Sequence, residues 1–202
     1  MLKRNKMSTI KRFTGRVLLV AAANLAMSVS ARAADGSLDY RILATSKTST
    51  MEKELNEAAA GGYRFAKAMG GKSANGGEEV IVAMMKEAAT AGQGTLRYKL
   101  LATTKTSTMQ KEMQRWADEG YEYVEQTVFQ SAFGGREVVV IMEADSARQA
   151  PRSTYQLLAT TKTSTMQKEL KEAGAQGYVL LGLTIGKTEM GGDEVVAVLR
   201  KN

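Results

Sequence analysis

The 202-residue chain contains no cysteine, no histidine and only one proline, Pro151. Without cysteine there is no disulfide framework, so stability must come from packing. Without histidine the chain cannot use histidine acid–base catalysis, a Ser-His-Asp nucleophile or a histidine pH switch, and nearly all zinc sites are excluded because they draw on His and Cys. The sequence indicates no cofactor and no metal site, and it leaves any catalytic residue unidentified.

The first 33 residues have the layout of a secretory signal peptide. A basic region without acids (1–16) precedes an apolar run (17–27) and a small-x-small site at Ala31-Arg32-Ala33. The apolar run is shorter than a bilayer span requires. We expect export by the general secretory route, to the periplasm or beyond, with cleavage between Ala33 and Ala34. A retained anchor is the alternative, and the mature chain is expected to have no transmembrane segment.

The excess of positive charge belongs to that leader. The whole chain has 28 basic and 21 acidic residues, and seven of the basic residues but none of the acidic ones lie in 1–33. Cleavage leaves 21 of each, which is a formal net charge of zero. A neutral domain has no general attraction to phosphate backbones, so no nucleic-acid partner is expected.

One stretch of thirteen residues occurs three times. LLATTKTSTMQKE stands at 100–112 and again at 157–169, and ILATSKTSTMEKE stands at 42–54. A tyrosine opens each copy, at Tyr40, Tyr98 and Tyr155. A long-period repeat of this kind predicts an array of supersecondary units. The predicted repeats cover 38–86, 96–143 and 153–201.

Each repeat reads as strand, helix, strand, strand. The helix, of about eleven residues from Thr50 in the first copy, carries apolar residues at the spacing of one buried stripe. A glycine at 62, 120 or 177 is expected to end it. The third strand, such as 80–85, is apolar almost throughout, which indicates a central strand covered on both faces. The sheet order is then first-third-second, a split β-α-β unit.

The predicted fold class is α+β, with three tandem βαββ repeats in one compact domain. Each helix covers one face of its small sheet, so something else must cover the other face. We expect the three sheets either to pack around a pseudo-threefold axis or to join as one continued sheet, because a single repeat of about fifty residues buries too little surface alone. Three independent beads are the less favoured alternative.

The hydroxyl-rich centre of the repeated stretch has two interpretations. Ser49 and Glu52 have the S-x-x-E/Q spacing of a helix capping box, and the other copies keep it as Ser107 with Gln110 and Ser164 with Gln167. The alternative is a small-anion site, because lysine, hydroxyls and free N–H groups at a helix N-terminus favour negative charge. That candidate site comprises Lys47, Thr48, Ser49, Lys105, Thr106, Ser107, Lys162, Thr163 and Ser164.

The repeats also resemble a known family. An aromatic-basic-x-Leu strand at 40–43, a Thr-Met-x-Lys-Glu-Leu helix at 50–55, a Gly-Tyr pair at 62–63 and a final Glu-Val-rich strand are similar to domain of unknown function 4177, a family of small bacterial domains. The resemblance implies a short βαββ unit, three times over. It implies no activity, cofactor or catalytic residue.

For function, the sequence favours an exported, non-catalytic protein that binds an unknown protein or small ligand of the cell envelope or serves a structural role there. The first alternative is a small-anion-binding protein that uses the three KTS segments. The second is an enzyme with a carboxylate site that the spacing does not locate.

Overall fold

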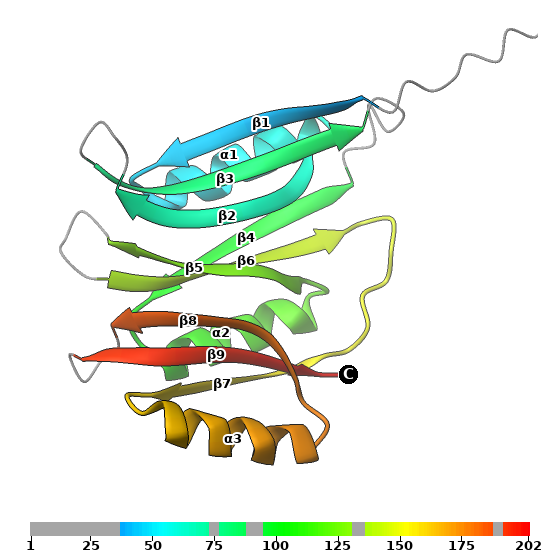
Figure 1. The fold of residues 1–202 in the computed structure, drawn as a ribbon. Helices are drawn as coiled ribbons and strands as arrows, with labels where there is room; N and C mark the ends of the chain where they lie inside the picture. The colour runs from blue at the N-terminus through cyan, green and yellow to red at the C-terminus, as the bar shows by residue number, and fades with distance from the viewer. Residues whose placement is uncertain (1–36, 73–76, 88–94, 131–135, 188–191) are drawn as a thin grey trace, which may run out of the picture. The chain divides into compact units, whose positions relative to one another are not determined.

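The computed structural model describes residues 37–72, 77–87, 95–130, 136–187 and 192–202, and Figure 1 shows the order of their elements. Repeat 1 consists of β1 (Leu38–Thr45), α1 (Thr48–Ala60), β2 (Arg64–Lys72) and β3 (Glu78–Glu87). Repeat 2 consists of β4 (Leu96–Thr103), α2 (Thr106–Asp118), β5 (Glu122–Gln130) and β6 (Arg136–Asp145). Repeat 3 consists of β7 (Thr154–Thr160), α3 (Thr163–Ala175), β8 (Val179–Lys187) and β9 (Asp193–Lys201).

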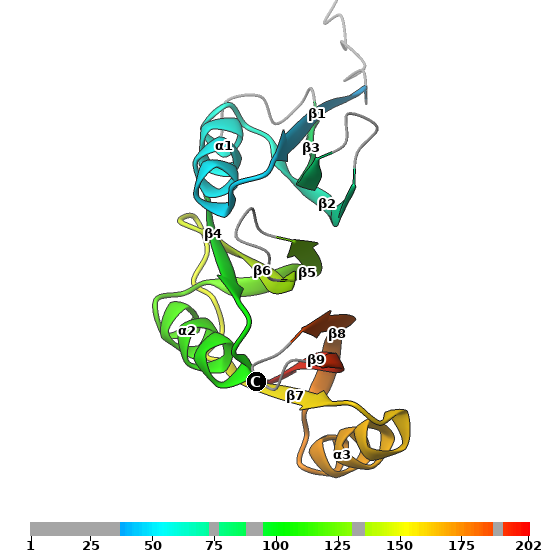
Figure 2. The ribbon, with the colours of Figure 1, turned by 90° about the vertical axis from the view of Figure 1, so that its left-hand side faces the viewer.

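Every repeat forms its own three-stranded antiparallel sheet with the third strand in the centre. The orders are β1-β3-β2, β4-β6-β5 and β7-β9-β8. Each helix lies against one face of the sheet of its own repeat (Figure 2). The predicted α+β class with three βαββ units is therefore confirmed, as is the central place of the apolar third strand.

The helices form because their apolar residues make one stripe. In α1 the buried positions are Met51, Leu55, Ala58 and Ala59. The helix ends where Gly62 takes a φ of 85°, a left-handed conformation that glycine adopts at little cost. The equivalent glycines of the other repeats both have φ 89°. The N–H of Tyr63 then closes the turn on the carbonyl of Ala58 at 3.1 Å.

The second strand of each repeat is interrupted at the same point. Its register against the central strand shifts between Phe65 and Lys67 in β2, between Tyr123 and Glu125 in β5, and between Leu180 and Gly182 in β8. A bulge of this kind inserts one residue, bends the strand and disturbs the hydrogen-bond ladder locally. Backbone groups near the bulge are therefore accessible to partners from outside the sheet.

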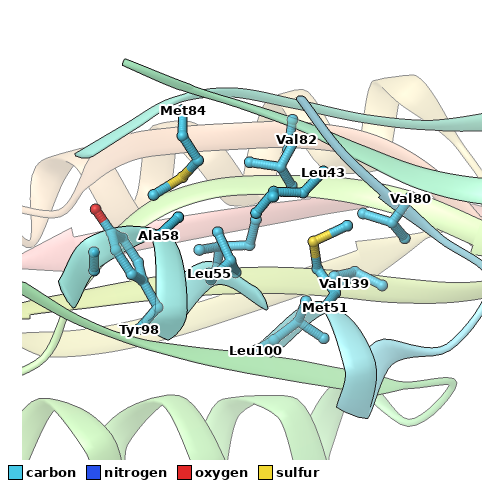
Figure 3. Packing of buried hydrophobic residues seen from close by; sticks show 13 residues of the cluster. Leu43, Met51, Leu55, Ala58, Val80, Val82, Met84, Tyr98, Leu100 and Val139 are labelled. Carbon is cyan, nitrogen blue, oxygen red and sulfur yellow. The ribbon is translucent and has the colours of Figure 1, made fainter. Parts of the chain in front are cut away.

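The apolar cores are shared between consecutive repeats. Met51 and Leu55 of α1 lie in one cluster with Tyr98, Leu100 and other side chains of repeat 2, and Figure 3 shows these residues packed together. A second cluster joins α2 and β6 to Tyr155, Leu157, Val196 and Val198 of repeat 3 in the same way. Residues 34–202 form one compact unit.

This packing corrects the two expected ways of covering the second face of each sheet. The three sheets are separate, so they do not form one continued sheet. Among the described residues the extensive contacts run from repeat 1 to repeat 2 (α1 with β4, β2 with β5) and from repeat 2 to repeat 3 (α2 with β7, β5 with β8). Closure about a threefold axis needs equally extensive contacts between repeats 1 and 3. Instead, the free sheet faces of repeats 2 and 3 are each covered by the helix side of the preceding repeat.

Candidate functional site

The three KTS segments stand at the starts of the three helices. Lys47 is the last residue before α1, and its backbone N–H donates to the Thr45 hydroxyl at 3.1 Å. Lys105 and Lys162 hold the same place before α2 and α3, with equivalent bonds to Thr103 and Thr160. The threonine that ends each strand thus makes the turn into the helix.

This turn overturns the predicted capping box. Because the Thr45 turn starts α1 at Thr48, two residues earlier than expected, Ser49 lies inside the helix, where it is exposed. The residue at the cap position is Lys47, and no side chain caps the helix there. The same holds for Ser107 in α2 and Ser164 in α3. The serines of the repeated stretch are therefore not helix caps.

The Glu/Gln of the repeated stretch binds the next repeat instead. Glu52 accepts a hydrogen bond from the backbone N–H of Leu100 on β4 at 3.1 Å, and its other oxygen lies 2.8 Å from the Lys99 ammonium. Gln110 accepts from the N–H of Leu157 on β7 at 3.1 Å. A carboxylate and an amide both offer an acceptor oxygen, which explains why the two residues are interchangeable here.

One helical turn later, an amide makes a second contact with the same strand. The Asn56 side chain donates to the Tyr98 carbonyl at 3.0 Å and accepts from the Tyr98 N–H at 2.9 Å. Gln114 accepts from the Tyr155 N–H at 3.0 Å. The repeat pattern did not single out these amides. Their signal is an amide four residues after Glu52 and after Gln110, on the helix face beside the apolar stripe.

The opening tyrosines complete the contact between repeats. The Tyr98 hydroxyl accepts the backbone N–H of Phe65 at 2.8 Å, beside the bulge of β2, and donates to Glu143 at 2.6 Å. The Tyr155 hydroxyl accepts the N–H of Tyr123 at the equivalent bulge, also at 2.8 Å. The bulge therefore presents a backbone donor that the next repeat's tyrosine satisfies.

Burial, followed by the nearby Glu143 carboxylate, raises the pKa of Tyr98 well above its ordinary value. Burial also raises the pKa of Tyr155. Because the folded-state pKa of both groups is raised, their contribution to stability is complete below the unfolded tyrosine pKa of about 10 and is lost as the pH rises above it. Near neutral pH both phenols are protonated and serve as fixed hydrogen-bond partners.

The surroundings of the KTS segments differ from one repeat to the next. Thr48 and Ser49 border a groove of about 470 Å³ that Lys99 and Trp116 also line. Thr106 borders a space of only about 10 Å³, and Thr163 borders an apolar groove of about 390 Å³ on repeat 3. The identical letters therefore do not build three identical sites.

The described part of the chain has neither a metal-binding group nor a helix that could span a membrane. It contains no group of three or more acidic side chains placed to hold a metal ion. None of its helices combines the length and apolar character needed to cross a bilayer. Comparisons with protein-family models, curated proteins and solved structures found no match to this chain.

Two single substitutions in α2 distinguish a contact between repeats from a helix cap. We expect Gln110→Ala to lower the free energy of unfolding by about 1 kcal/mol, because the Leu157 N–H loses its acceptor. Ser107→Ala should change it by less than about 0.5 kcal/mol, since Ser107 is exposed and not a cap. Urea unfolding followed by circular dichroism measures both.

The matched control is Gln167→Ala in α3, because Gln167 is exposed and contacts no other repeat among the described residues. It should also leave the unfolding free energy within about 0.5 kcal/mol of the wild type. A larger loss for Ser107→Ala than for Gln110→Ala would restore the capping interpretation.

Proposed function

We propose that this chain is an exported, non-catalytic module of the cell envelope that acts through protein contacts or as a structural element. One observation carries the proposal: the Glu/Gln position of the repeated stretch is used between repeats. Glu52 and Gln110 each accept a hydrogen bond from the backbone of the following repeat. The conspicuous motif thus serves assembly. The resemblance to domain of unknown function 4177 stays a prediction and bears on the fold alone.

Export is tested by the mass of the processed protein. Expression of the full chain in a bacterial host, followed by intact-mass analysis of the exported fraction, should give a chain that starts at Ala34. The reason is the small-x-small site that ends at Ala33. A chain starting at Met1 in the membrane fraction would show a retained anchor instead.

The anion-binding alternative rests on Lys47, Lys105 and Lys162, and a thermal titration separates it from the proposal. A ligand of the folded state raises the melting temperature in a saturable way. We expect phosphate and sulfate to produce no saturable rise in the wild type. The matched variant replaces all three lysines with glutamine, and any general salting-out effect should be equal in both proteins. A saturable rise that disappears in the variant would establish anion binding and contradict the proposal.

A further inference from the structure

The two faces of each sheet have different partners. One face carries the helix of its own repeat and is called here the helix side; the opposite face is called the outer face. The outer faces of repeats 2 and 3 are covered by the preceding repeat, so that Tyr98 is 1% exposed and Tyr155 is 2% exposed. The same interface, helix side against outer face, is therefore built twice within the described part of the chain.

The outer face of repeat 1 is not covered by any other repeat of the described residues. Tyr40 and Ile42 occupy the positions of Tyr98 and Leu100, yet they are 59% and 64% exposed. Leu38 and Met69 are exposed large apolar residues as well. The register places Ile42 beside Ala83 and Met69 beside Ile81, so these side chains share one face of the sheet. This face is an apolar surface of the kind that marks a binding site.

The helix side of repeat 3 is not covered by any other repeat of the described residues. Its groove of about 390 Å³ is lined by residues that include Met166, Gln167, Leu170 and Leu183. Their counterparts in repeat 1 (Met51, Glu52, Leu55 and Ala68) contact or lie packed beside repeat 2. Along β8, Leu180, Leu183 and Ile185 are exposed. The helix sides of repeats 1 and 2 are covered by the next repeat, whereas the equivalent surface of repeat 3 is exposed and forms this groove.

We infer that the outer face of repeat 1 in one copy of this chain docks on the helix side of repeat 3 in a second copy. This deepens the proposed function by naming the partner, and it rests on that proposal only in assuming that the chain acts through protein contacts. The new contact would continue the interface already built twice within the chain, because repeat 1 supplies an exposed outer face and repeat 3 supplies an exposed helix side. Such a head-to-tail contact joins two different surfaces, so it adds copies in series unless the geometry closes a ring.

The residues at the two ends can repeat two of the three hydrogen bonds that both internal interfaces share. Gln167 offers the Ile42 N–H the acceptor that Gln110 offers Leu157. The Tyr40 hydroxyl can accept a hydrogen bond from the Leu180 N–H of the second copy, as the Tyr98 hydroxyl accepts one from Phe65. The third shared bond has no counterpart: Lys171 replaces Asn56 and Gln114, and a lysine can donate to a carbonyl but cannot accept from an N–H. The contact between copies is accordingly weaker than the internal ones, and association is reversible.

Sedimentation equilibrium tests this on the protein purified after expression of the full chain. Between about 1 and about 200 μM, the average mass of the wild type should rise past that of a dimer. Ile42→Asp removes the first surface and Leu183→Asp removes the second, because an unpartnered carboxylate resists burial. Each variant alone should remain monomeric, with its dissociation constant raised more than about 100-fold. An equimolar mixture of the two should form a dimer and stop there, since one intact interface remains.

Ser107→Asp is the matched control, because it adds the same charge at an exposed position of the middle repeat. It should associate as the wild type does. A wild type that stays monomeric over the whole range overturns the inference, as does a mixture that forms no dimer although circular dichroism shows both variants folded. Export and the absence of anion binding are measured separately, so the proposed function survives or fails on its own data.

Discussion

Replacing Gly70 with alanine is expected to lower the free energy of unfolding by about 3 kcal/mol, at the upper end of the usual cost of overpacking. A Cβ at this position would lie 1.9 Å from the Val128 carbonyl oxygen on β5, which is backbone and cannot rotate away. The N–H of Gly70 also donates to the Thr127 hydroxyl at 2.7 Å. Alanine would therefore force β2 away from β5 and break the contact between repeats 1 and 2.

Gly71→Ala provides the control in the same strand. A Cβ at Gly71 meets nothing within 4 Å, so the unfolding free energy should stay within about 0.5 kcal/mol of the wild type. Urea unfolding measured by far-UV circular dichroism gives both values. Equal costs for the two substitutions would show that β2 and β5 are not in close contact.

The fold could be predicted because its signals lie within one repeat. The near-continuous apolar run of β3 indicated a strand covered on both faces, and its central place follows from that. Gly62, Gly120 and Gly177 marked the helix ends because each requires a positive φ. These are local requirements, and the residues that meet them are present in every repeat.

The helix start could not be predicted from the capping spacing. Ser49 and Glu52 have the spacing of a capping box, but the Thr45 hydroxyl competes by making a turn with the Lys47 N–H. That turn moves the helix start two residues toward the N-terminus. Glu52 then faces the next repeat, and no pattern within one repeat shows what the next repeat offers it.

The contact between repeats escaped prediction for a related reason. Tyr40 and Tyr98 open copies of the same motif, yet one is exposed and the other is buried. Identical letters can have different surroundings when only their neighbours differ. Whether a tyrosine is buried depends on the neighbouring repeat, and a pattern within one repeat contains no information about that neighbour.

The opening tyrosines offer the second large effect. Tyr98→Ala should lower the free energy of unfolding by about 4 kcal/mol, as for other large aromatic truncations in a core. It removes a fully buried ring and the hydroxyl that binds Phe65 and Glu143. Tyr155→Ala should cost a similar amount, because its ring is buried and its hydroxyl binds the backbone of Tyr123.

Repeats 2 and 3 are each held by the repeat before them, and the comparison of Tyr98→Ala with Tyr40→Ala tests this central claim most directly. Tyr40 is the same residue at the equivalent position, but no other repeat of the described residues covers it, and it is largely exposed. Urea unfolding is followed by far-UV circular dichroism and by the fluorescence of Trp116, the single tryptophan, at a protein concentration where the chain is monomeric. The account predicts coincident transitions in the wild type, a loss of about 4 kcal/mol for Tyr98→Ala and less than about 0.5 kcal/mol for Tyr40→Ala. Equal losses for the two variants would contradict it.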